Sequence, residues 1–140
     1  MNDRYLFKAK RLDNGEWIIG SLIQNPFFKG VRSWISSEQE DKTRLKSISR
    51  TQALWNSIEV DSTTICQCTG LKDKNGNLIW ENDIVKINNS KVNMLITFRD
   101  FEIICTIPNE KYYKHRLEYD TEYEVIGNIF DNKELLESEE

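Results

Sequence analysis

The sequence has few of the residues that would cross-link the chain or carry it into a membrane. Three cysteines and two prolines occur among 140 residues, and three cysteines cannot all pair with one another. A chain of this length can bury enough apolar surface to fold without disulfides, so we expect reduced thiols. No run approaches the roughly twenty apolar residues of a membrane helix, and the first four residues do not lead into a signal-peptide core. We therefore expect a cytoplasmic protein.

Positive charge and histidine are also scarce. Lysine and arginine number 19 against 23 aspartates and glutamates, which gives a formal net charge of −4. The overall field of such a protein repels polyanions, so nucleic acid would need a local basic patch. His115 is the one histidine, and no glycine-rich elbow surrounds a serine or cysteine nucleophile. We therefore expect no catalytic residues and a non-enzymatic protein.

The composition is otherwise that of an ordinary globular domain. Hydrophobic residues make up 39% and charged residues 30% of the chain, well away from the low hydrophobicity of disordered chains. One domain is the default at this length, so we expect residues 1–140 to form a single domain.

Apolar runs of strand length alternate with turn residues along most of the sequence. Gly15 separates two such runs and Asn75-Gly76 separates two more, and both positions suit the turn of a β-hairpin. Near the end, Asp131 or Asn132 could cap a short C-terminal helix. The regular spacing of strands and turns favours a barrel or a sandwich. The predicted strands lie at 5–12, 17–23, 31–35, 58–60, 63–69, 78–80, 84–87, 92–99, 102–107 and 123–130.

Residues 36–56 are the least specified part of the chain. They are polar and charged, and their few apolar side chains fit only a weak helical face. We interpret this stretch as a solvated surface excursion, with a short helix as the alternative, and assign no site to it.

Three blocks of the sequence resemble the YopX family of phage and prophage proteins. The central block reads TGLKDKNG at 69–76 and IWENDIVK at 79–86, the opening block covers 7–17, and the closing block covers 123–132. Where such proteins usually carry Glu-Gly-Asp, this chain has Glu81-Asn82-Asp83, and asparagine is the non-glycine residue that best tolerates a left-handed turn. The resemblance implies phage or prophage origin and a mainly β fold, and it brings no catalytic residue with it.

The cysteines suit either a metal site or the core. Cys66 and Cys68 alternate along a predicted strand, so their side chains would share one face and could share a metal with Cys105 and His115. A free cysteine on a strand is more commonly a small buried hydrophobe. We therefore expect buried, structural thiols, no metal and no cofactor.

Acidic and aromatic residues leave similar alternatives. Carboxylates in near-pairs could bind a hard cation or share acid and base roles, but carboxylates on turns and solvent faces are the norm. We expect the tryptophans to lie in the core or at its rim, with a subunit interface as the alternative. The acidic sets are Glu81 and Asp83, Asp100 and Glu102, and Asp120, Glu122 and Glu124; the tryptophans are Trp17, Trp34, Trp55 and Trp80.

The segment 111–116 is the one that suits nucleic acid best. Its cations flank two adjacent aromatic rings, the combination needed for phosphate neutralisation and base stacking. The alternative is an exposed turn whose tyrosines cover the barrel, and the acidic charge of the whole chain favours it. The candidate binding residues are Lys111, Tyr112, Tyr113, Lys114 and Arg116.

Together these patterns predict a mainly β, barrel-like domain with a short C-terminal helix. For its second half, from about Gly70 to Phe130, we consider an SH3-like small barrel. We expect a phage- or prophage-derived binding or assembly module that forms a homo-oligomer or acts on a phage or host protein. Nucleic-acid binding through 111–116 is the alternative, and a small metal-dependent enzyme is a more distant one.

Overall fold

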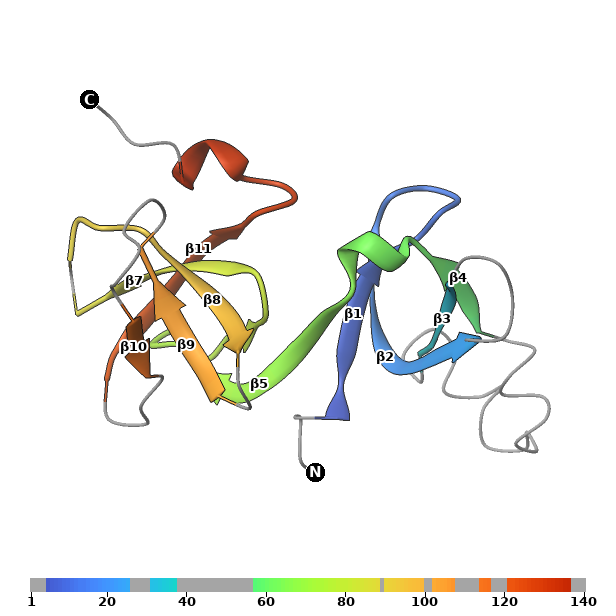
Figure 1. The fold of residues 1–140 in the computed structure, drawn as a ribbon, viewed down its shortest axis with the longest axis horizontal. Coiled ribbons are helices and arrows are strands. Elements are labelled where there is room, and N and C mark those ends of the chain that lie inside the picture. The colour runs from blue at the N-terminus through green and yellow to red at the C-terminus, as the bar shows by residue number, and fades with distance from the viewer. Residues whose placement is uncertain are drawn as a thin grey trace. The chain divides into compact units, whose positions relative to one another are not determined.

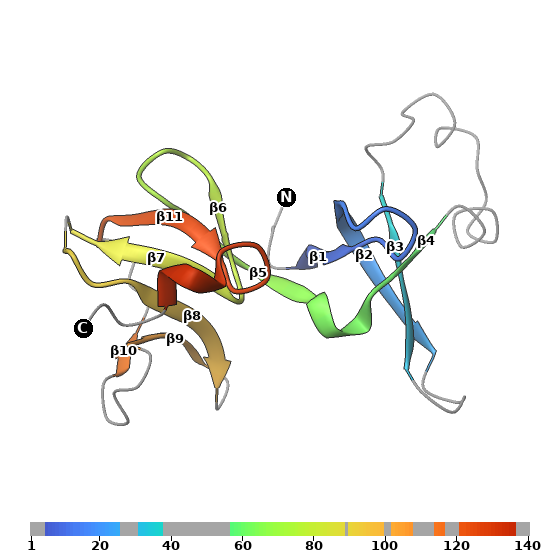
Figure 2. The ribbon, with the colours of Figure 1, turned by 90° about the horizontal axis from the view of Figure 1, so that it is seen from above.

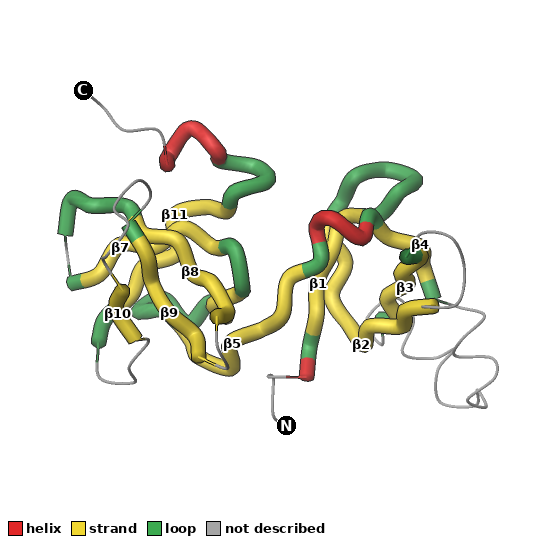
Figure 3. Tube along the Cα trace, in the orientation of Figure 1, coloured by secondary structure: helices red, strands yellow, loops and turns green. Residues whose placement is uncertain are grey.

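The computed structural model describes residues 5–25, 31–37, 57–88, 90–99, 102–107, 114–116 and 121–136. Most of these residues form strands, and the helical elements η2 (Ser62–Thr64) and η3 (Lys133–Leu136) are short 3-10 turns (Figure 3). The expected mainly β fold is thus confirmed, whereas the expected C-terminal helix is a single 3-10 turn. Within the described ranges, no helix is long and apolar enough to cross a membrane.

The chain divides into two compact units, Tyr5–Gln67 and the part from Cys68 onward. We call them the N-terminal and the C-terminal unit. The chain passes from one to the other within β5 (Cys66–Lys72) (Figure 1). That residues 1–140 form one domain stays a prediction.

The N-terminal unit is an antiparallel sheet that curls around its own core. Its strands neighbour one another in the order β4 (Ile58–Val60), β3 (Arg32–Ser36), β2 (Trp17–Asn25), β1 (Phe7–Lys10) and the start of β5 (Figure 2). A single bridge between Arg11 and Val60 brings the far edge of β4 back to the end of β1. One face of the sheet is apolar, and its buried residues are Ala9, Ile18, Ile35 and Val60.

Two glycines make this curled sheet possible. Gly15 has φ +73 in the turn between β1 and β2, so the predicted hairpin is confirmed. A Cβ on Gly20 would collide with the backbone carbonyl of Ser36, so only glycine lets β2 and β3 approach this closely here.

The C-terminal unit contains β6 (Leu78–Trp80), paired with β5, and a five-stranded antiparallel sheet. The sheet order is β10 (Lys114–Arg116), β9 (Glu102–Thr106), β8 (Met94–Arg99), β7 (Asp83–Ile87) and β11 (Tyr123–Asn128). Four strands meander and the fifth returns beside the first (Figure 1), the arrangement that an SH3-like small barrel needs. Along the described residues no ladder joins β10 to β11, so the sheet is open. The buried core consists of Ile79, Val85, Met94, Ile96, Cys105 and Tyr123.

Candidate functional site

Asp73 holds the tight turn between β5 and β6 and ties it to β11. Its Oδ1 accepts hydrogen bonds from the backbone N–H groups of Asn75 and Asn77, both at 2.9 Å, and its Oδ2 accepts one from Val125 at 3.1 Å. The side chain is buried. Burial alone would raise the pKa of Asp73, but the hydrogen bonds from Val125, Asn77 and Asn75 outweigh it, and the pKa lies below its ordinary value. Asp73 is therefore an ionised structural residue.

Other side chains of the central block also hydrogen-bond to the backbone. Thr69 Oγ1 donates to the carbonyl of Ile79 at 2.7 Å, and Asp83 Oδ2 accepts from the N–H of Trp80 at 2.8 Å. Asn82 has φ +71, which confirms the left-handed conformation expected where the family usually has glycine. The block that resembles the family thus builds the fold.

The closing block works in the same way. Asn128 Oδ1 accepts hydrogen bonds at 2.9 Å from the N–H groups of Phe130 and Asp131, and the N–H of Asn128 donates to Asn132 Oδ1 at 3.2 Å. A Cβ on Gly127 would come within 2.5 Å of that same Asn132 oxygen. The closing block is thus strand β11 (Tyr123–Asn128) followed by a compact turn that these hydrogen bonds hold together.

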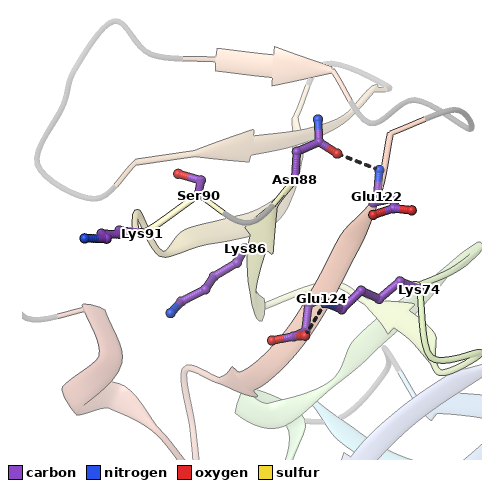
Figure 4. A pocket seen from close by; sticks show the side chains of 7 residues that line it. All are labelled: Lys74, Lys86, Asn88, Ser90, Lys91, Glu122 and Glu124. Carbon is purple, nitrogen blue, oxygen red and sulfur yellow. Dashed lines mark hydrogen bonds and ion pairs between the residues drawn. The ribbon is translucent and has the colours of Figure 1, made fainter.

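A polar hollow of about 260 Å³ opens on the C-terminal unit beside β7 and β11 (Figure 4). Three segments form it: the turn after β5, the end of β7 with the turn that follows it, and the start of β11. Its lining carries ammonium groups, carboxylates, an amide and a hydroxyl, contributed by Lys74, Lys86, Asn88, Ser90, Lys91, Glu122 and Glu124.

The backbone around the hollow is fixed by a ladder and by a turn. Lys86 lies directly opposite Glu124 in the antiparallel pair of β7 and β11. Asn88 adopts φ +47 and makes two hydrogen bonds with Glu122: its N–H donates to the Glu122 carbonyl at 2.9 Å, and its Oδ1 accepts from the Glu122 N–H at 3.1 Å (Figure 4). The positions from which the charged side chains project are therefore well defined.

The charges of the hollow are only partly compensated. Lys74 Nζ lies 2.8 Å from Glu124 Oε2 (Figure 4), and this hydrogen bond, followed by the Glu124 charge, raises the pKa of Lys74. The lining contains three lysines and two glutamates, a surplus of one positive charge. Small-molecule pockets are mostly apolar, so this polar lining suits the ionised groups of a larger partner.

Sequence reasoning identified part of this hollow. The predicted near-pair Glu122 and Glu124 lies at it, but the lysines were missed. Lys86 carried a signal, because it is the one cation in the otherwise apolar end of β7, Ile84–Ile87.

The predicted nucleic-acid segment is only partly described. Lys111, Tyr112 and Tyr113 lie outside the described residues. Lys114 and Arg116 lie on β10, opposite Thr106 and Ile104 of β9, and the structure describes their backbone alone. Their role in binding nucleic acid stays a prediction.

The three cysteines are free and buried, which confirms their expected place in the core. Burial raises the pKa of the Cys105 thiol to about 12. Within the part of the chain that the structure describes, no three histidine, cysteine, aspartate or glutamate side chains gather as a metal site. Of the remaining acidic residues, Asp100 and Asp120 lie outside the described ranges.

The fold is shared with known proteins. The family model described as YopX protein matches residues 6–137. Among solved structures, the crystal structure of protein EF1440 from Enterococcus faecalis is similar, with 25% sequence identity, a TM-score of 0.53, and coverage of 94% of this chain and 96% of that chain. No curated protein matches the chain.

Proposed function

This chain belongs to the YopX family, whose model spans nearly its whole length, and we propose that it is a phage- or prophage-derived protein that works by binding rather than by catalysis. It acts in the cytoplasm of the bacterial host, on a phage or host protein.

The observation that carries this proposal is the hollow of the C-terminal unit. Lysines and glutamates line it side by side, on positions fixed by the β7–β11 ladder and the Asn88 turn. Charged groups arranged in this way select a partner by electrostatic complementarity. Thr69, Asp73 and Asp83 of the central block support the same conclusion, because the side chain of each hydrogen-bonds to the backbone.

Affinity purification from lysogenic or infected cells tests the proposal, with three tagged forms as bait: the wild type, Lys86→Glu/Lys91→Glu, and the control Lys72→Glu/Lys133→Glu. The control makes the same change of charge at exposed positions outside the hollow. We expect a protein that co-purifies with the wild type and the control and is lost with the hollow variant. The same set of proteins with all three baits would refute the proposal.

Self-association is part of the same proposal. β10 is the end strand of the C-terminal sheet, and an end strand offers backbone N–H and C=O groups that a second copy can pair with. We propose a homo-oligomer. Light scattering should give a mass above that of one 16.6 kDa chain; a monomeric mass across a wide concentration range would contradict it.

A further inference from the structure

The N-terminal unit presents two tryptophans that each lie below a cation. The Nζ atoms of Lys8 and Lys10 lie 4.6 and 5.4 Å from the centroid of the Trp17 ring, and Cζ of Arg32 lies 5.2 Å from the centroid of Trp34. Both tryptophans are half-buried. Trp80 of the C-terminal unit, by contrast, is only 5% exposed. Trp17 and Trp34 therefore lie at the rim of the core, one of the two positions expected for the tryptophans.

The strand register places these side chains on the outer face of the sheet. Lys10 lies opposite Trp17 in the β1–β2 pair, and Trp34 lies opposite Ile23 and Glu59 in its two pairs. Side chains alternate between the two faces of a strand, and the neighbours Ala9, Ile18 and Ile35 belong to the core. We call the outward set, Lys8, Lys10, Trp17, Arg32 and Trp34, the cation-tryptophan face.

Arg32 is held in place on this face. Its Nε and Nη2 donate to the two carboxylate oxygens of Glu59 at 2.9 and 2.8 Å. More than half of the Arg32 side chain, 59%, remains exposed. The guanidinium is thus oriented beside Trp34 while much of the side chain stays open to solvent, an arrangement in which little side-chain entropy is lost on binding.

The sequence of this unit is less acidic than that of the C-terminal unit. Residues 5–67 contain nine lysines and arginines against seven aspartates and glutamates, whereas residues 68–140 contain nine against fifteen. The acidic charge of the whole chain therefore belongs to the C-terminal unit. The field of the C-terminal unit therefore repels a polyanion, whereas that of the N-terminal unit does not.

We propose that the cation-tryptophan face binds single-stranded nucleic acid, with phosphates at Lys8, Lys10 and Arg32 and bases stacked on Trp17 and Trp34. Unpaired bases can stack on exposed aromatic rings, whereas duplex bases already stack on one another. Positions 17 and 23 are six residues apart on β2, about 20 Å at roughly 3.3 Å per residue, so the face spans several nucleotides. This site is distinct from the hollow of the C-terminal unit and goes beyond the function proposed for it.

Fluorescence anisotropy of labelled 12-mers of thymidylate and of uridylate measures this binding in the full chain, and the comparison of the two decides between DNA and RNA. We expect binding at low salt that weakens as salt rises, and weaker binding of a 12-base-pair duplex. Each neutralised phosphate contributes about 0.7 to the slope of log affinity against log salt for single strands. Lys8→Gln/Lys10→Gln/Arg32→Gln should therefore reduce that slope by about 2.

Two matched triple variants locate the site. Lys72→Gln/Arg99→Gln/Lys133→Gln removes the same charge from exposed positions of the C-terminal unit, and we expect it to bind as the wild type does. Lys111→Gln/Lys114→Gln/Arg116→Gln tests the segment identified from sequence. If either of these triples weakens binding as much as the triple on the cation-tryptophan face does, that face is not the site.

Trp34→Leu separates stacking from charge. It keeps an apolar side chain but removes the ring, and we expect a loss of affinity of roughly tenfold with the salt slope unchanged. If circular dichroism shows that this variant does not fold, the three triple variants at charged residues still decide whether the cation-tryptophan face is the site. If the wild type binds neither oligonucleotide at low salt, the proposal is wrong. The hollow variant Lys86→Glu/Lys91→Glu should bind both oligonucleotides as the wild type does. The proposals for the hollow and for the cation-tryptophan face can therefore be refuted independently.

Discussion

The N-terminal and C-terminal units are both small antiparallel β-structures, yet they carry opposite balances of charge. Cations exceed carboxylates by two in residues 5–67, and carboxylates exceed cations by six in residues 68–140. The surfaces differ accordingly: one unit presents tryptophans under cations, and the other a mixed hollow of lysines and glutamates. Similar strand arrangements therefore carry differently charged surfaces, and the net charge of the whole chain hides this difference.

The units also differ in where their polar side chains are used. In the C-terminal unit, buried Asp73 bonds three backbone N–H groups across two segments. In the N-terminal unit, the comparable carboxylate is Asp61, which accepts from the N–H and hydroxyl of Thr63 at the start of η2 and stays partly exposed. The blocks that mark the family lie mostly where the fold depends on such buried polar contacts.

The largest expected effect comes from truncating the two cores. Ile35→Ala and Ile79→Ala each remove a side chain that is 0% exposed, and each should lower the free energy of unfolding by about 2 to 5 kcal/mol. Because β5 pairs with β1 of the N-terminal unit and with β6 of the C-terminal unit, we expect one cooperative transition in denaturant that both variants shift. Two transitions, each shifted by only one variant, would show that the units unfold independently and would contradict the single-domain prediction.

The next effect separates the two carboxylates. Asp73→Ala leaves three backbone N–H groups without their ionised acceptor and should cost about 2 to 3 kcal/mol of unfolding free energy. Asp61→Ala removes a cap from a short 3-10 turn and should cost about 1 kcal/mol. Denaturant unfolding of both variants checks the order. Equal losses of unfolding free energy would mean that the buried hydrogen bonds of Asp73 stabilise the fold no more than the partly exposed cap at Asp61 does.

The same carboxylate predicts a dependence on pH. The pKa of Asp73 in the folded protein lies below its ordinary value of 3.8, so its contribution to stability is complete above that value and is lost as pH falls through the folded pKa. The wild type should therefore lose more stability than Asp73→Asn between about pH 5 and pH 2. Parallel pH profiles of the two proteins would exclude this role for Asp73.

The smallest expected effect concerns the exposed ion pairs. Lys74→Ala and Arg32→Ala each remove one partner of an exposed pair, and exposed pairs contribute little to stability. We expect melting temperatures within experimental error of the wild type for both. Of the two variants, only Arg32→Ala should weaken oligonucleotide binding. A similar loss of affinity in Lys74→Ala would contradict the assignment of this binding to the N-terminal unit.

Local rules explain what the sequence could predict. The hairpin at Gly15, the turn at Gly76 and the left-handed Asn82 depend on backbone preferences of single residues, and all three are present. The C-terminal helix was predicted from capping residues, but Asn132 accepts from Asn128 and the remaining turn is only four residues long. A stretch of four residues is far too short to be a stable α-helix on its own, so capping residues alone do not specify one.

Both proposed binding surfaces depend on strand register, which the sequence pattern does not specify. The hollow forms because the turn after β5 and the end of β7 meet at β11, and no spacing in the chain indicates that Lys74 and Glu124 approach each other. The cation-tryptophan face requires that Lys10 be paired with Trp17 rather than with its neighbour, since a slip of one residue would turn Trp17 into the core. The sequence could not sort the tryptophans between core and rim: Trp17 and Trp34 are half-buried, Trp80 is buried, and Trp55 lies outside the described residues.

The proposed division between an N-terminal unit that binds nucleic acid and an acidic C-terminal unit can be tested directly by nuclear magnetic resonance. Titration of the single-stranded 12-mer into the ¹⁵N-labelled protein reports on each tryptophan through its indole N–H signal. We predict that the signals of Trp17 and Trp34 shift with the oligonucleotide while that of buried Trp80 stays in place. Unchanged Trp17 and Trp34 signals at saturating oligonucleotide, or shifts confined to the C-terminal unit, would contradict it.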